Sequence, residues 1–267
     1  LKQGPARQAM RLAGLPDNTG ATTINKLCGS GMKATMFAYD SIKAGTNDIV
    51  VSGGMESMTN APYVLDKARS GMRMGHGQVF DHMFLDGLED AETGRLMGSF
   101  AQEVADKRSI TREDMDNYAI ESLNRANAAI DNGWFKDEIV PVTVKTRKGE
   151  VVVDTDEQPG NANIDKIPTL RPAFAKDGTV TAANASSISD GGSALVLARE
   201  SVANERGLKP LARILAHATN SKHPSEFTIA PIGATEAVMK KAGWTVDDVD
   251  LFEINEAFAM VAMMPMI

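Results

Sequence analysis

The N-terminal part of the chain has a strand–turn–helix–strand pattern that constrains the fold more than any other feature. Residues 21–25 are rich in β-prone side chains, and Gly29 and Gly31 predict a tight turn just after them. Residues 32–44 have apolar side chains at helical spacing, and residues 48–52 form a short apolar run. A strand, a crossover helix and a second apolar strand are typical of a parallel sheet that is covered on both faces. The pattern therefore predicts an α/β fold.

The middle of the chain lacks this alternation and predicts an insertion into the core. Thr111 can cap a helix, with Asp114 three residues later approximating a capping box. We expect an extended excursion at residues 64–90 and this capped helix at residues 111–133. A hairpin with a basic tip should follow at residues 139–153, and a polar loop at residues 154–172.

The last third returns to sheet texture. Apolar runs predict strands at residues 194–198, 211–216 and 250–254, and residues 232–242 predict a helix between the last two. We therefore expect an α/β core that an inserted domain interrupts at residues 58–188.

Composition and charge exclude several classes of function. The formal net charge of -7 argues against nucleic acid as a bulk electrostatic partner. One cysteine excludes a disulfide within the chain and a Cys-rich zinc site. No apolar run approaches the roughly 20 residues that span a bilayer, so no membrane partner is expected. The chain starts with Leu1 instead of Met, and we expect the true N-terminus to be absent.

Two residues have positions that suit catalysis. Cys28 precedes a glycine-rich turn and the start of a helix, where backbone amides and the helix dipole favour a thiolate. The alternative is a buried cysteine that acts as a small hydrophobe. Asn255 follows an apolar run, so its amide could donate to an oxyanion or hold a water that does so. The alternative is that Asn255 caps the next helix.

Other polar residues carry weaker signals. The glycine-ended loop at residues 184–192 allows a ligand to approach, but resembles many loops. Glu56 can orient a neighbour or cap a helix. The four histidines stand singly, so we interpret them as structural or surface residues and expect no metal site; they are His76, His82, His217 and His223.

Six motifs together resemble the thiolase family, particularly acetyl-CoA acetyltransferases. They occur in the family's order and spread over nearly the whole chain. The motifs are Ile24-Asn-Lys-Leu-Cys-Gly-Ser-Gly-Met-Lys-Ala, Ser52-Gly-Gly-Met-Glu-Ser-Met, Phe135-Lys-Asp-Glu-Ile-Val-Pro-Val, Leu170-Arg-Pro-Ala-Phe, Gly178-Thr-Val-Thr-Ala-Ala-Asn-Ala-Ser and Asn255-Glu-Ala-Phe-Ala.

The resemblance implies an incomplete thiolase-like layered α/β fold (αβαβα) with an inserted loop domain. An N-terminal core would comprise residues 1–57, and the loop domain residues 58–188. The chain would return to the first core at residues 189–208 and start a C-terminal core at residues 209–267. The resemblance also implies a homo-oligomer, a tetramer or dimer, with the segment at residues 64–82 in the tetramer contact. A role in fatty acid metabolism and a cytoplasmic location are further expectations.

The implied chemistry is acyl transfer between coenzyme A thioesters. The Cys28 thiolate would accept an acetyl group, and the enolate of a second acyl-CoA would attack to give a 3-ketoacyl-CoA; the reverse reaction is thiolysis. Asn255 would help to position an oxyanion-hole water. No cofactor is implied beyond the CoA thioester substrates. The residues that would contact CoA are Ser186, Ala182, Ala183, Met97 and Phe174, with Lys166 or Arg171 near its nucleotide end.

The chain departs from the family pattern at three places. Leu96 stands where many biosynthetic members have a CoA-contacting His, and residues 157–166 lack an arginine that some members present to the nucleotide. The family's Gly-His-Pro and Cys-x-Gly-Gly loops follow Asn-Glu-Ala-Phe, and neither occurs before Ile267. We therefore expect negligible thiolase activity from these 267 residues alone.

Alternative functions remain open from the sequence. One is a thiolase for longer-chain 3-ketoacyl-CoA, which chain-length profiling would separate. Another is a non-catalytic acyl-CoA-binding protein that keeps the fold without the chemistry. A decarboxylating ketoacyl synthase shares the fold but lacks the Asn-Glu-Ala-Phe motif, which disfavours it.

Overall fold

The computed structural model describes residues 2–267, which divide into two compact units. Unit 1 comprises residues 2–94 and 188–217, and unit 2 comprises residues 95–187 and 218–267. Each unit is therefore built from two separate stretches of the chain. The domain boundaries expected from the sequence differ from this division and stay predictions.

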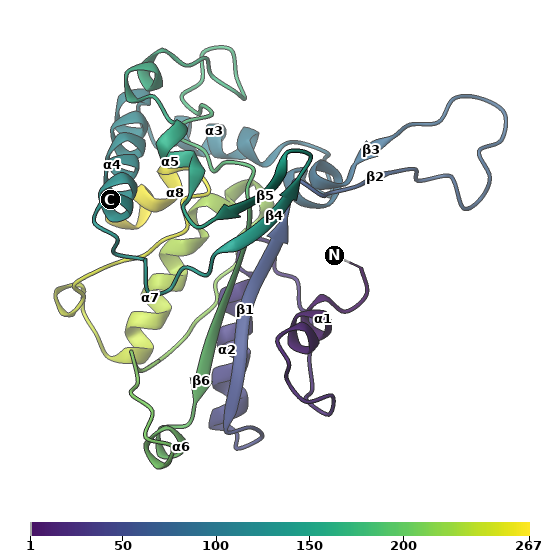
Figure 1. Cartoon of the computed structure of the whole chain (residues 1–267). Coiled ribbons are helices and arrows are strands. Elements are labelled where there is room, and N and C mark those ends of the chain that lie inside the picture. Colours follow the sequence, from purple (N-terminus) through teal and green to yellow (C-terminus); the bar gives the residue numbers. More distant parts are fainter. Residues whose placement is uncertain (1) are drawn as a thin grey trace. The chain divides into compact units, whose positions relative to one another are not determined.

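Unit 1 is built around one long antiparallel pair of strands (Figure 1). The register runs from Ile49 opposite Ala198 to Ser57 opposite Asp190. A Cβ atom at Gly53 would overlap the carbonyl oxygen of Ser193, so only glycine permits this approach of the strands. The elements of unit 1 are α1 (Pro5–Leu12), α2 (Ser30–Lys43), β1 (Ile49–Ser57), β2 (Tyr63–Val64), β3 (Phe80–Asp81), the π-helix η1 (Phe84–Leu88), β6 (Asp190–Ala198) and α6 (Glu200–Glu205).

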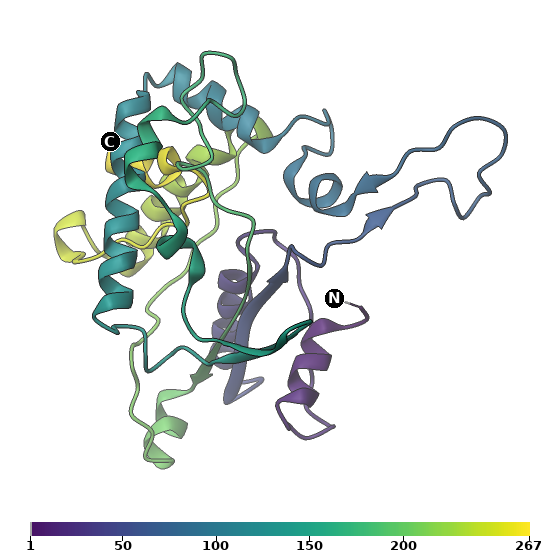
Figure 2. The ribbon, with the colours of Figure 1, turned by 45° about the horizontal axis from the view of Figure 1, so that its top comes forward.

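Helix α2 lies along the β1–β6 pair in both ribbon views (Figures 1 and 2). The Thr35 and Ser52 hydroxyls are 3.0 Å apart, and Arg199 Nη2 donates to the Ile42 carbonyl over 2.9 Å. The ribbon nevertheless leaves many apolar side chains in solvent, with Val196 70% exposed. Unit 1 therefore has one covered stripe and no wide core.

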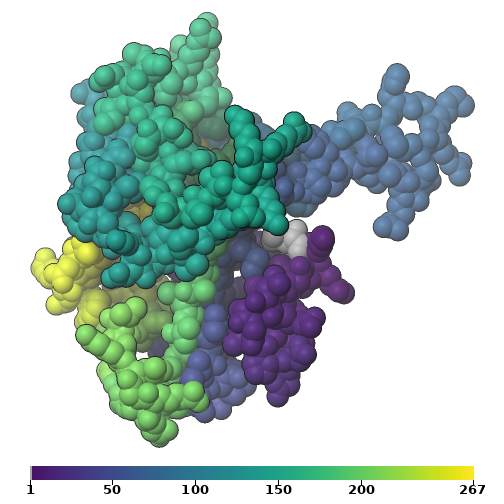
Figure 3. Space-filling view, in the orientation of Figure 1, coloured from purple at the N-terminus to yellow at the C-terminus, as the bar shows by residue number. Residues whose placement is uncertain are grey.

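The short strands β2 and β3 carry an arm, residues 65–79, which extends away from the rest of unit 1 (Figures 1 and 2). On the face that the space-filling view shows, no other part of unit 1 covers the arm (Figure 3). Met74 in this arm is fully exposed. The expected extended excursion at residues 64–90 is confirmed, apart from β3 and η1 at its end.

Unit 2 is mainly helical. Its helices α4 and α8 lie side by side in both ribbon views (Figures 1 and 2). Its elements are α3 (Met97–Lys107), α4 (Arg112–Asp131), β4 (Val142–Thr146), β5 (Gly149–Val153), α5 (Glu157–Asn161), η2 (Ile164–Thr169), η3 (Pro224–Ile229), α7 (Ala230–Ala242), η4 (Val246–Asp248), α8 (Ala259–Met263) and η5 (Met264–Met266).

A continuous apolar cluster forms the core of unit 2. Met115 and Met260 are completely buried in it, and side chains from α3, α4, α8 and the segment around Val180 complete it. Such burial contributes about 1.5–3 kcal/mol for each large apolar side chain. This core holds α4 and α8 together.

Several local predictions for unit 2 are confirmed. Thr111 and Asp114 form a capping box at the start of α4, with the Thr111 hydroxyl accepting from the Asp114 amide. The hairpin β4–β5 pairs Val142 with Val153 and Thr146 with Gly149. Helix α7 ends at Gly243, which has a positive φ of 72° as its C-cap.

Other predictions of secondary structure are wrong. Residues 21–25, 211–216 and 250–254 are not strands, because no strand among residues 2–267 pairs with them. The parallel sheet is also absent among these residues: β1 pairs antiparallel with β6 instead. Residues 154–172 contain two short helices, α5 and η2, within the predicted loop. Within residues 2–267 no helix has the length and apolar character that a membrane span requires.

Candidate functional site

Cys28 lies in a tight turn two residues before α2. The Gly29 amide donates to the Lys26 carbonyl over 3.1 Å, and the Ser30 hydroxyl donates to the Leu27 carbonyl over 2.7 Å. Leu27 has a positive φ of 50°, which is rare for a residue with a Cβ atom. The Cys28 thiol is exposed, so the buried, hydrophobe-like alternative is wrong.

Close backbone packing positions this turn over strand β1. Gly31 faces Gly54, and a Cβ atom at Gly31 would be 3.5 Å from the Gly54 amide nitrogen. The motif with Gly53 and Gly54 thus belongs to a strand. Glu56 also lies in β1, where its Oε1 accepts from the Ser57 amide over 3.0 Å, so Glu56 caps no helix.

Asn255 is exposed in the segment that leads to α8. The N-cap of α8 is Phe258, so the interpretation of Asn255 as a helix cap is wrong. Its side chain makes no hydrogen bond within residues 2–267. The amide is therefore available to a ligand or a water molecule, in agreement with its predicted role, which stays a prediction.

The loop at residues 181–187, the Ser186 loop, pairs directly with residues 255–258, the Asn255 segment. Ser186 donates twice to it: its hydroxyl to the Glu256 carbonyl over 2.6 Å, and its amide to the Ala257 carbonyl over 3.0 Å. An isolated antiparallel bridge between Ala185 and Phe258 continues the contact. Unit 2 thus brings together two motifs that lie about 70 residues apart in the sequence.

The Glu256 carboxylate is bound by two hydroxyls from α4. Tyr118 Oη donates to Oε1 over 2.9 Å, and Ser122 Oγ donates to Oε2 over 2.7 Å. Burial of the phenol, followed by its hydrogen bond to Glu256, raises the pKa of Tyr118 to about 12. Neither residue was predicted from the sequence; their spacing of four places them on one face of a helix, which is the available signal.

The Asn184 side chain fixes the start of the Ser186 loop through hydrogen bonds. Its side-chain oxygen accepts from the Thr181 amide over 2.7 Å, and its Nδ2 donates to Asp116 Oδ1 over 2.9 Å. Asp116 also forms an ion pair with Arg112 at 2.6 Å. Asn184 and Asp116 are buried, so this network replaces contacts that both would otherwise make with water. Asn184 is therefore a structural residue of the loop.

The remaining predicted CoA contacts lie in unit 2 with varied exposure. Phe174 stacks edge-on against Phe258, with ring centroids 6.3 Å apart. A Cβ atom at Gly98 would overlap the Phe174 ring, so Phe174 lies against the first turn of α3 beside Met97. The half-buried residues are Ala183, Met97 and Phe174. The exposed residues are Ala182, Ser186, Lys166 and Arg171.

The histidines occupy structural or surface positions. His82 pairs with Asp86 at 3.0 Å, and His217 pairs with Asp40 at 2.8 Å. The His223 ring caps η3, where it accepts from the Ser225 amide. Within residues 2–267, His, Cys, Asp and Glu side chains form no group of three that could hold a metal ion.

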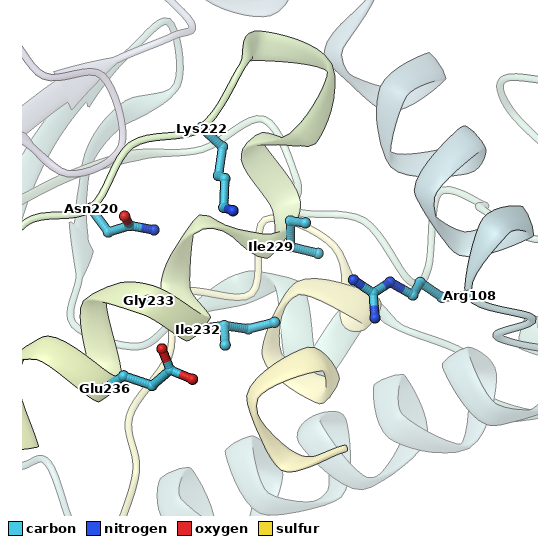
Figure 4. Close-up of a pocket in the computed structure, with 7 residues that line it drawn as sticks. All are labelled: Arg108, Asn220, Lys222, Ile229, Ile232, Gly233 and Glu236. Carbon is cyan, nitrogen blue, oxygen red and sulfur yellow. The ribbon is translucent and has the colours of Figure 1, made fainter.

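Unit 2 also has a pocket of about 360 Å³ beside α7. Arg108 and Lys222 reach it from opposite sides of Ile229 (Figure 4). Asn220, Ile232, Gly233 and Glu236 complete the lining. None of the predicted site residues lines this pocket, so it is separate from the Ser186 loop.

Comparison with known proteins assigns the family of this fold. The chain belongs to the thiolase family: the description "Thiolase, N-terminal domain" matches residues 1–201, and "Thiolase, C-terminal domain" matches residues 208–266. An acetyl-CoA acetyltransferase of Yarrowia lipolytica is 49% identical over 261 residues, which are 98% of this chain and 65% of that protein. One from Chromobacterium violaceum is 49% identical over 263 residues, or 98% and 67% of the two chains.

Solved structures give the same result. The crystal structure of the Bacillus anthracis acetyl-CoA acetyltransferase has a TM-score of 0.94 at 41% identity, covering 99% of this chain and 67% of that one. The Ascaris suum thiolase Acat5, solved in complex with coenzyme A, has a TM-score of 0.93 at 39% identity, covering 99% and 68%. The thiolase-like α/β fold is therefore confirmed. The chain spans about two thirds of the length of the curated relatives.

Proposed function

We propose that the protein transfers acyl groups between CoA thioesters through an acetyl-cysteine at Cys28, in the direction of acetoacetyl-CoA synthesis or of its thiolysis. The observation that carries this proposal is the exposed Cys28 thiol, held in a hydrogen-bonded turn two residues before α2. The names of the relatives, acetyl-CoA acetyltransferases, support the same chemistry. In the forward direction the thiolate attacks the thioester carbonyl, the C–S bond to CoA breaks, and CoA leaves as its thiolate, which then takes a proton from water.

Alkylation of the single cysteine tests this role directly. Iodoacetamide should modify Cys28 at neutral pH faster than a free thiol, and prior incubation with acetyl-CoA should block the reaction. A Cys28→Ser variant gives the background. Equal rates with and without acetyl-CoA would remove Cys28 as the acyl acceptor, and a rate no faster than that of a free thiol would favour a binding protein without the chemistry.

We propose further that the Ser186 loop and the first turn of α3 contact the pantetheine arm of CoA. Ser186, Ala182 and Ala183 share one loop, and Phe174 lies beside Met97. Asn255 is placed next to this loop by the bonds from Ser186 to Glu256 and Ala257.

The exposed Lys166 and Arg171 would meet the nucleotide end of CoA as point charges. Changing both to alanine should weaken the binding of CoA but leave the binding of pantetheine, which has no nucleotide, unchanged. Lys148→Ala, at the tip of the β4–β5 hairpin, is the matched control. Equal losses for CoA and pantetheine would contradict the assignment.

We also propose that the protein is a homo-oligomer, a tetramer or dimer, and that the arm at residues 65–79 forms part of the contact. The arm exposes Met74, Val79 and Leu65. Met74→Glu should lower the oligomeric mass in sedimentation, whereas Met32→Glu in α2 should not. A role in fatty acid metabolism fits this acyltransferase chemistry and is part of the proposal.

A further inference from the structure

The carboxylate of Glu256 is held from one side by helix α4. Both oxygens are bound: Tyr118 donates to Oε1 over 2.9 Å and Ser122 donates to Oε2 over 2.7 Å. These two donors lie four residues apart on the same face of a 20-residue helix. Hydrogen bonds to an ionised acceptor are shorter and stronger than neutral ones. Glu256 therefore has a defined position relative to α4.

The backbone of the same residue is held by Ser186. The Ser186 hydroxyl donates to the Glu256 carbonyl over 2.6 Å, its amide donates to Ala257 over 3.0 Å, and the Ala259 amide donates to the Asn184 carbonyl over 2.8 Å. Glu256 thus lies between a rigid helix and the loop that carries the predicted CoA contact.

The anchoring hydroxyl of Tyr118 is itself fixed by packing. The Tyr118 ring packs against the apolar cluster of unit 2, which includes the buried Met115 one turn earlier in α4. Asn255, in contrast, is exposed and makes no side-chain hydrogen bond within residues 2–267. The position of the Asn255 amide therefore depends on the backbone, and the next residue in that backbone is Glu256.

We propose that Tyr118 and Ser122 are positioning residues of the acyl-transfer site. They hold the Glu256 carboxylate, and Glu256 in turn sets the position of Asn255 relative to Ser186. Both hydroxyls bond to the Glu256 carboxylate and act through it. The inference rests on the proposed function for its consequence, the binding of CoA, but not for the local geometry.

The test uses the 267-residue chain with Tyr118→Phe, Ser122→Ala and the double variant. Amide exchange measured by NMR reports the local geometry, and calorimetric titration with CoA reports its consequence. In the double variant we expect exchange of the Ser186 and Ala259 amides to rise about tenfold relative to the Val180 amide, which bonds to Gln102 in the same unit. The Kd for CoA should rise about fivefold.

Two sets of controls separate positioning from general stability. The control variant Tyr39→Phe with Ser41→Ala also removes one tyrosine and one serine hydroxyl, but from α2 in unit 1. It should leave the amide exchange rates and the Kd for CoA unchanged. Glu256→Gln keeps a side chain that can bond both hydroxyls and should restore most of the exchange protection that Glu256→Ala loses. If the carboxylate only adds general stability, the loss in Glu256→Ala and its rescue by Glu256→Gln should extend equally to the Val180 amide; we expect both to be confined to the Ser186 and Ala259 amides.

The possible outcomes decide the inference separately from the proposed function. Uniform acceleration of Ser186, Ala259 and Val180 in the double variant would overturn the positioning role. A wild-type chain that does not bind CoA would count against the proposed function, while the exchange readout would still decide whether the hydroxyls position the segment. Faster local exchange with an unchanged Kd for CoA would overturn the link between Glu256 and the binding site.

Discussion

The two units position their candidate residues by different physical means. Unit 2 has a continuous core in which Met115 is 0% exposed, and the Ser186 loop and the Asn255 segment are attached to its helices. Unit 1 has no such core: the Cys28 turn is held by short-range hydrogen bonds, and Met32 in the following helix is 67% exposed. The position of the Asn255 segment therefore depends on core packing, and the shape of the Cys28 turn depends on local hydrogen bonds.

The largest contrast between the units should come from matched methionines. Met115→Ala leaves a cavity in the core of unit 2 and should lower the free energy of unfolding by about 2–5 kcal/mol. Met32→Ala, on the exposed side of α2, should cost less than about 1 kcal/mol. Urea unfolding followed by circular dichroism measures both. Equal losses of unfolding free energy would show that Met32 contributes to a core of unit 1, contrary to its exposure.

A second contrast concerns buried and exposed asparagines. Asn184→Ala removes the partner of the Thr181 amide and of the buried Asp116, and should cost about 1–3 kcal/mol of unfolding free energy. Asn60→Ala removes one bond to the Ser57 hydroxyl in an exposed turn of unit 1. Its cost should stay within about 0.5 kcal/mol. A large decrease of the urea midpoint in Asn60→Ala would contradict the expected difference between the two units.

A third contrast uses the cap of α4. Thr111→Ala removes the capping box and should cost about 1 kcal/mol, whereas Thr46→Ala in a turn of unit 1 should be near neutral. Hydrogen bonds from the Thr111 side chain and amide lower the pKa of Asp114 below 3.8. The contribution of the ionised Asp114 to the free energy of unfolding is present above pH 3.8 and is lost as the pH falls through the folded-state pKa of Asp114. The stability difference between wild type and Thr111→Ala should therefore narrow in acid; a constant difference would argue against the box.

The smallest effect is expected in alkali. The pKa of Tyr118 is raised by burial and by Glu256 from 10.0 to about 12. Because the folded-state pKa lies above the unfolded one, the contribution to stability is present below pH 10 and is lost as the pH rises toward 12. Tyrosinate absorbance should show one step with a midpoint near 12. Tyr118→Phe should abolish this step and Tyr39→Phe should retain it; the reverse result would place the phenol with the raised pKa in unit 1.

The sequence predicted elements that local signals specify. The helix at residues 32–44 was predicted by apolar spacing, the start of α4 by Thr111 and Asp114, and the hairpin by two short apolar runs. Strand pairing was not predictable in this way. An apolar run such as residues 250–254 shows a preference for extended backbone, but it becomes a strand only if a neighbour offers hydrogen bonds. The direction of pairing between β1 and β6 depends in the same way on the path of the chain between them.

The candidate site shows the same division. Glycines after Cys28 predicted its turn, although not the positive φ of Leu27. The bonds of Ser186 to the Asn255 segment join residues about 70 positions apart, and no local pattern encodes them. Tyr118 and Ser122 were missed for a related reason: hydroxyls on a helix are ordinary surface residues until a carboxylate from elsewhere in the chain meets them.

The Cys28 turn has a consequence for the order of folding. Its closing hydrogen bonds join residues no more than four positions apart, such as Lys26 with Ser30. Loops of this size close within about 10–100 ns, so the turn can form while most of the chain is still unfolded. The pairing of Ser186 with Glu256 instead requires a loop of about 70 residues to close, and contacts of that range form slowly. In each newly made chain, the turn around the Cys28 thiol should therefore form well before the Asn255 segment pairs with the Ser186 loop.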